Sequence, residues 1–111
     1  MSIDTKVQNN ILVVNLEGEI DHHTSTVIRE EVDKIYNTSR LNHIIFNFEK
    51  VTFMDSSGVG LLIGRYRMVT MAGGKIGLVK VKSELDKVMN LSGVYKLMKR
   101  FEDESVAISH L

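Results

Sequence analysis

Residues 43–48, with the sequence His-Ile-Ile-Phe-Asn-Phe, form an almost uninterrupted apolar run. Such a run is typical of a central strand that is covered on both faces, as in a parallel sheet. A helical pattern follows at residues 59–71, where apolar side chains recur at three- and four-residue spacing. The order of buried strand, short connection and helix is typical of α/β proteins, so we expect a sheet with helices packed on it.

Two further strands are predicted at the N-terminus, because apolar and polar residues alternate at positions 3–7 and 12–16. The short spacing and the Asn pair between them predict a hairpin. We expect residues 18–23 to leave the second strand as a loop. We also expect Thr24 or Ser25 to cap the helix that follows.

The C-terminal half continues the alternation of strands and helices. We expect a turn at positions 49–50, a strand at 75–81, a helix with Ser83 as its cap, a strand or extended segment within 94–101, and a last helix whose first turn holds the acidic residues 102–104. Together these patterns predict an α/β fold, a mixed β-sheet with an N-terminal hairpin and about four packed helices.

Length and composition predict one domain over residues 1–111, with 43% apolar residues to fill a core. Lys plus Arg and Asp plus Glu are balanced at 14 each, which argues against a nucleic-acid-binding protein. The absence of cysteine excludes disulfides and thiolate metal sites. The chain starts without a secretory signal pattern and has no apolar run of membrane-spanning length, so we expect a cytoplasmic protein.

The connection between the central strand and its helix, Phe-Met-Asp-Ser-Ser-Gly-Val-Gly at positions 53–60, places Asp55, Ser56 and Ser57 at a helix N-terminus. Free backbone N–H groups and the positive end of the helix dipole would stabilise a phosphate there. The residues alone leave a second interpretation open, because Asp and Ser are also the ordinary N-cap residues. The nearby glycines, including Gly58, indicate that a neighbouring element or a partner approaches this backbone closely.

Other chemistries fit the sequence less well. The glycine spacing in the helix misses the dinucleotide-binding pattern, and neither Ser56 nor Ser57 lies in a Gly-x-Ser-x-Gly elbow. A small hydrolase that uses one of these serines is the rival interpretation. The adjacent residues Asp21, His22 and His23 lack the ligand spacing of a metal site. We therefore expect no cofactor and no bound metal, whereas spacing alone leaves a catalytic Ser-His-Asp site open, since such triads assemble in space.

Three segments of the chain resemble the STAS-domain anti-sigma factor antagonists. They are Gly-Glu-Ile-Asp-His-His at 18–23, the motif at 53–60, and Leu-Ser-Gly-Val at 91–94, where Val stands in place of the family's Leu. The resemblance runs nearly end to end and implies the STAS fold. The paired histidines are most similar to those of antagonists from the sporulation circuit of spore-forming Firmicutes, rather than to the general-stress antagonists.

In that family the domain is the substrate of its own partner and not an enzyme. The resemblance implies that an anti-sigma factor with serine kinase activity phosphorylates Ser56 with ATP and that a PP2C-type phosphatase removes the phosphate. The unmodified form binds the anti-sigma factor and displaces the sigma factor, whereas the phosphorylated form does not. By the same resemblance, the partner-binding residues are Asp21, His22, Asp55, Ser56, Ser57 and Gly58.

Two alternatives remain open at this point. Ser57 is a competing phosphate acceptor, because its hydroxyl has the same chemistry as that of Ser56. The circuit is also open, since a partner-switching protein of the general stress response would carry the same fold. In either case a helix N-terminus tolerates a phosphate, so we expect the switch to act at the interface with little change of fold.

Overall fold

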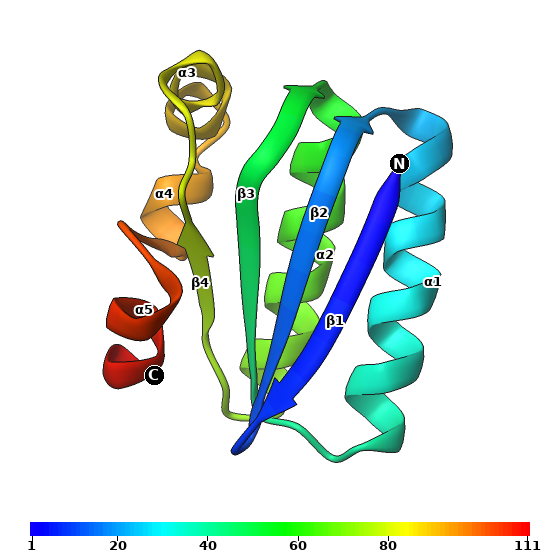
Figure 1. Cartoon of the computed structure of the whole chain (residues 1–111), viewed down its shortest axis with the longest axis vertical. Helices are drawn as coiled ribbons and strands as arrows, with labels where there is room; N and C mark the ends of the chain where they lie inside the picture. Colours follow the sequence, from blue (N-terminus) through cyan, green and yellow to red (C-terminus); the bar gives the residue numbers. More distant parts are fainter.

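The five strands of the sheet pair in the order in which they occur in the chain, as shown in a computed structural model that describes residues 1–111 (Figure 1). The strands are β1 (Ser2–Gln8), β2 (Ile11–Ile20), β3 (His43–Met54), β4 (Ile76–Val79) and β5 (Lys99–Phe101). β1 and β2 form an antiparallel hairpin, and β2, β3, β4 and β5 run parallel. The predicted mixed sheet with an N-terminal hairpin is therefore confirmed.

The helices connect the parallel strands and complete the C-terminus. They are α1 (His22–Thr38), α2 (Ser56–Met71), α3 (Ser83–Leu91), the single turn α4 (Val94–Leu97) and α5 (Glu104–His110). Successive crossovers between neighbouring parallel strands have the same hand, so they place their helices on the same face of the sheet. No helix is long and apolar enough to cross a lipid bilayer.

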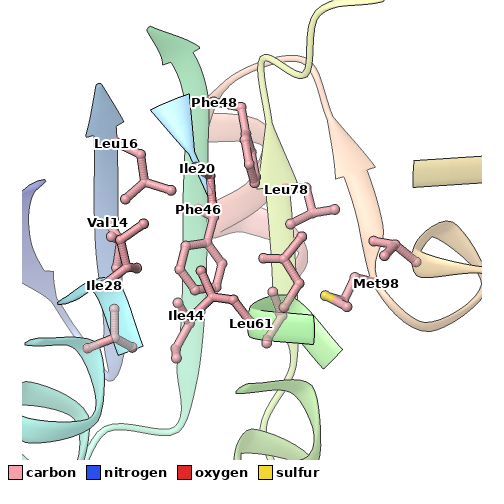
Figure 2. Packing of buried hydrophobic residues seen from close by; sticks show 14 of the residues in the cluster. Val14, Leu16, Ile20, Ile28, Ile44, Phe46, Phe48, Leu61, Leu78 and Met98 are labelled. Carbon is pink, nitrogen blue, oxygen red and sulfur yellow. The ribbon is translucent and has the colours of Figure 1, made fainter. Parts of the chain in front are cut away.

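The core lies on both faces of the sheet, because adjacent residues of the central strand point in opposite directions. Phe46 of β3 lies within the larger cluster, between Ile28 of α1 and Leu61 of α2 (Figure 2). Its neighbour Ile45 belongs to a smaller cluster on the other face, where Ala107 of α5 packs against it. β3 is apolar over almost all of this run because both of its faces are buried.

Two strands extend beyond their predicted ends. The loop expected at 18–23 begins only after Ile20, where β2 ends, and the turn expected at 49–50 is absent because β3 runs without a break through Lys50. The pairing of β2 with β3 shifts register near Gly18, and this irregularity allows both strands to continue past the expected ends. Gly18 has a φ of 112°. The polar residues that resembled breaks are instead exposed strand positions or part of the irregularity.

Several predicted helix boundaries also change. The α1 helix begins at His22, with Asp21 as N-cap in place of Thr24 or Ser25, and α2 begins at Ser56 instead of residue 59. Ser83 does not cap α3, because Lys82 occupies the N-cap position without a side-chain bond. Within the segment 94–101, the expected short strand is confirmed as β5, and the single turn α4, which was not expected, precedes it. A helical turn this short carries almost no periodic signal.

Candidate functional site

Two helix N-termini lie side by side at one edge of the sheet. Ile20 and Met54 are paired at the ends of the parallel strands β2 and β3, and each strand leads directly into a helix. The N–H of Asp55 donates to the carbonyl oxygen of Ile20 at 3.2 Å, which joins the two junctions. In Figure 1 both α1 and α2 begin at the end of the molecule where β2 and β3 end. The structure thus brings Asp21 next to the Asp55 turn.

The first of these N-termini is closed by a capping box. The Thr24 N–H donates to Asp21 Oδ1 at 2.9 Å, and the Asp21 N–H donates to the Thr24 hydroxyl at 2.9 Å. The hydrogen bond from the Thr24 backbone holds the pKa of Asp21 below its ordinary value. His22 follows as the first residue of α1 and is exposed. The expected loop at Asp21 and His22 is thus a rigid helix start, since the two reciprocal bonds fix its backbone.

At the second N-terminus, Asp55 caps α2. Its carboxylate accepts the N–H of Ser57 at 2.8 Å, and its carbonyl oxygen accepts the N–H of Gly58 at 3.0 Å. Gly58 is buried against β2 and β3, where an added Cβ would lie 2.2 Å from Cγ of Met54. The sequence left open whether a neighbouring element or a partner approaches the backbone at Gly58. The structure shows that the neighbouring strands do.

The two adjacent serines face different grooves. Ser56 is exposed and lines a largely apolar groove of about 640 Å³ between the α2 N-terminus and α3. Ser57 is half-buried and lines a polar groove of about 340 Å³ between α1 and α2. The polar groove also contains His22, Arg29 and Arg65. Because the backbone turns between the two serines, their hydroxyls have different surroundings although they are neighbours in sequence.

An ion pair in the α1–α2 groove tightens the packing of these two helices. Arg65 Nε lies 3.0 Å from Asp33 Oδ1, and the Arg65 side chain is only 12% exposed. Burial lowers the pKa of Arg65, and the adjacent Asp33 carboxylate opposes that shift. Arg65 has no predicted role, because nothing in the sequence pattern indicates that its side chain faces α1.

The apolar groove brings Leu91, which lies outside the 53–60 motif, next to residues of that motif. Phe53 is 47% exposed at the end of β3, and Leu91 is 78% exposed at the end of α3. Both line the groove beside Ser56. No local signal joins Leu91 to the motif, because Leu91 is distant in sequence and is brought to the site only by the path of the chain through β4 and α3.

Removal of the α2 cap should destabilise the protein measurably. In Asp55→Ala the Ser57 N–H loses its side-chain acceptor, and we expect the free energy of unfolding to fall by about 1 kcal/mol. Asp55→Asn is the matched control, since Asn caps a helix as well as Asp and should retain most of the stability. Urea unfolding followed by circular dichroism measures both variants. Equal stability of Asp55→Ala and the wild type would contradict the importance of this bond.

Comparison with known proteins places these features in a family. The sequence model of one protein family, the STAS domain, matches residues 2–107 of this chain. The anti-sigma F factor antagonist of Paenibacillus polymyxa is 32% identical over 111 residues, covering 100% of this chain and 95% of that protein. The anti-sigma-B factor antagonist of Bacillus subtilis (strain 168) is 29% identical over 94 residues, covering 85% of this chain and 84% of that protein.

Two solved structures of one antagonist are also similar. The anti-sigma factor antagonist SpoIIAA in its unphosphorylated form is 33% identical with a TM-score of 0.86, covering 98% of this chain and 95% of that one. SpoIIAA of Bacillus in the phosphorylated form is 34% identical with a TM-score of 0.77, covering 98% of both chains. Sequence and fold agree in these comparisons over nearly the whole length.

Proposed function

The chain belongs to the STAS-domain family, and from that premise we propose that it is an anti-sigma factor antagonist that phosphorylation of Ser56 switches off. The observation that carries this proposal is the exposed hydroxyl of Ser56 at the N-terminus of α2, between a second helix N-terminus and an open groove. The antagonist names of the relatives and the phosphorylated form of SpoIIAA support it.

Exposure favours Ser56 over Ser57 as the acceptor. A kinase must bring the γ-phosphate of ATP in line with the hydroxyl oxygen, so the acceptor must be accessible. Ser56 is exposed, whereas Ser57 is half-buried in the α1–α2 groove and its N–H is held by Asp55. Nothing in the described bonds occupies the Ser56 hydroxyl. These differences in surroundings give a physical reason for a choice that the sequence motif alone could not provide.

The partner of the proposed switch is an anti-sigma factor with serine kinase activity. It contacts a patch made of the two helix starts, formed by Asp21, His22, Asp55, Ser56 and Ser57. Gly58 is buried beneath this patch, where its lack of a side chain lets α2 start close to β2 and β3. A phosphate on Ser56 adds about −1.5 to −2 charges beside the Asp55 carboxylate. Those charges must be desolvated when the partner binds, so the modified protein is released. A PP2C-type phosphatase restores the unmodified form, and the cycle takes place in the cytoplasm.

The fold changes little in this mechanism, because the charge is added where a helix N-terminus tolerates it. The protein itself supplies no catalytic group: it presents a hydroxyl and a binding surface, and the partner carries out the chemistry. A hydrolase that used Ser56 would need a general base within hydrogen-bond reach. No such bond from the Ser56 hydroxyl is present among the residues of the turn.

We assign the protein to the sporulation circuit, with the general stress circuit as the second candidate. The similarity to the anti-sigma F factor antagonist extends over the whole chain. The Asp21-His22-His23 start of α1 is the segment whose resemblance to sporulation antagonists favours this circuit. The anti-sigma-B factor antagonist is slightly less identical and covers less of the chain. The difference between 32% and 29% identity is small, so the choice of circuit depends on which anti-sigma factor binds.

A displacement experiment tests the proposed function. We expect the unphosphorylated chain, added to a preformed complex of a sporulation anti-sigma factor with its sigma factor, to release the sigma factor as a separate peak in gel filtration. The complex of the general-stress anti-sigma factor serves as the comparison and should stay intact. If the sigma factor is released only from the general-stress complex, the protein belongs to the general stress circuit. Release from neither complex would refute antagonist activity toward these partners.

A further inference from the structure

The groove beside Ser56 contains one basic side chain. Of its lining residues, only Lys87 of α3 carries a positive charge, and Glu84 of the same helix is the only acid. Lys87 is exposed and forms no ion pair in the structure. Ser56 belongs to α2 and Lys87 to α3, and both residues line this groove.

We infer that Lys87 pairs with the phosphate of Ser56 across this groove, and that the pair closes the groove to the apolar side chains of the anti-sigma factor. The inference rests on the proposed function for the identity of the modification and the partner. It adds a residue and a surface that the motif does not include. The chemical basis is a charge-assisted contact between an ammonium group and a phosphate dianion.

Two of the N–H groups at the start of α2 are already bonded, so a cation would add to the stabilisation that this helix N-terminus gives a phosphate. A helix N-terminus usually offers its free N–H groups to an anion. Here the Ser57 N–H is already bonded to the Asp55 carboxylate at 2.8 Å, and the Gly58 N–H is bonded to the Asp55 carbonyl at 3.0 Å. The Asp55 carboxylate also repels the phosphate. A positive side chain from α3 would offset that repulsion, and Lys87 is the one that lines this groove.

The other cationic groups near the turn face elsewhere. Arg29 and Arg65 line the polar groove beside Ser57, and Arg65 is engaged by Asp33 at 3.0 Å. A phosphate on Ser57 would therefore enter the groove that the arginines line, whereas a phosphate on Ser56 would enter the groove that Lys87 lines. The two candidate acceptors thus have different partner cations, which makes the inference testable at each position.

The groove itself is suited to apolar contact in the unmodified protein. Phe53 and Leu91 expose 47% and 78% of their surfaces there, and Val59 and Val88 form part of its wall. The occupant that we assign is an apolar side chain of the anti-sigma factor, because the groove is continuous with the Ser56 hydroxyl on which the partner must act. A phosphate–lysine pair over this surface would replace an apolar opening with two hydrated charges.

The test uses phosphoserine placed at position 56 during translation, so that it does not depend on any kinase. The second pKa of the phosphate, near 6 for a free phosphoserine, is measured by ³¹P NMR as a function of pH. A nearby cation favours the dianion and lowers this pKa, so Lys87→Met should raise it by about half a unit. Lys96→Met removes an exposed lysine of α4 outside this groove and should leave it unchanged.

Phosphoserine at position 57 provides a second control, because Ser57 lines the other groove. Its phosphate pKa should not respond to Lys87→Met. Equal phosphate pKa values in the wild type and in Lys87→Met, with phosphoserine at 56, would overturn the pairing. An equal rise in Lys96→Met would overturn it too, since the effect would then be one of net charge. The two proposals can fail separately. If Lys87→Met raises the phosphate pKa but the kinase does not phosphorylate Ser56, the proposed function is refuted and the Lys87 contact still holds.

Discussion

Incubated with ATP and the anti-sigma factor kinase that we propose as its partner, the wild-type chain should gain one phosphate and the Ser56→Ala variant none. The reason is accessibility, since the Ser56 hydroxyl is exposed and unbonded at the start of α2. Alanine removes the acceptor oxygen and disturbs little else, because Asp55 and not Ser56 is the cap of this helix. Intact mass spectrometry followed by phosphosite mapping measures the outcome. This is the largest effect that we expect, because it is all or none.

Ser57→Ala is the matched control for this experiment, since it removes the adjacent hydroxyl and keeps the backbone N–H bond to Asp55. It should accept one phosphate as the wild type does. If Ser57→Ala accepts no phosphate and Ser56→Ala still accepts one, the phosphorylated residue is Ser57, in the α1–α2 groove. If an active kinase adds no phosphate to the wild type, the motif is not a phosphorylation site and acts only as a helix cap.

The same samples test how the modification acts. The unphosphorylated and phosphorylated chains should give the same far-UV circular dichroism, because the phosphate lies at the N-terminus of α2 and leaves its hydrogen bonds intact. Unfolding of α2 on phosphorylation would contradict a switch that acts only at the interface. Constitutive binding of Ser56→Ala to the anti-sigma factor in the presence of ATP is the corresponding functional result.

Periodic patterns in the sequence were sufficient for the layout of the fold. The apolar run at 43–48 predicted the central strand because burial on both faces leaves no room for polar residues, with Asn47 as the exception. Asn47 is buried and donates to Glu104 of α5 at 2.8 Å, a contact between residues 57 positions apart. No local pattern could predict this contact, because the partner comes from the last helix.

The candidate site was only partly predictable for a similar reason. The motif located Ser56 at a helix N-terminus, and the family resemblance placed Asp21 near it. The role of Asp21 as a helix cap was missed, since its position at the end of β2 depends on the register with β3. The separation of Ser56 and Ser57 into two grooves was also missed. Grooves form between elements, so their lining is fixed by tertiary packing and not by sequence spacing.

The apolar groove makes a second strong prediction. Leu91→Ser should weaken binding of the unphosphorylated chain to the anti-sigma factor by about thirtyfold. Burial of an exposed Leu side chain at an interface contributes about 2 kcal/mol, and each 1.4 kcal/mol changes the dissociation constant tenfold. Leu91 is the last residue of α3 and is 78% exposed, so the substitution should not change the fold. Isothermal titration calorimetry with the anti-sigma factor measures the dissociation constant.

Met71→Ser is the matched control, because Met71 is likewise the last residue of its helix, α2, and is 90% exposed. It lies at the opposite end of α2 from Ser56, roughly 20 Å away at 1.5 Å per residue, and it does not line the groove. The two variants remove similar apolar area from the surface, and only one of them changes the proposed docking groove. A loss of affinity confined to Leu91→Ser would identify the groove as partner-binding surface. Equal affinity of both variants and the wild type would show that the partner contacts the helix starts without entering the groove.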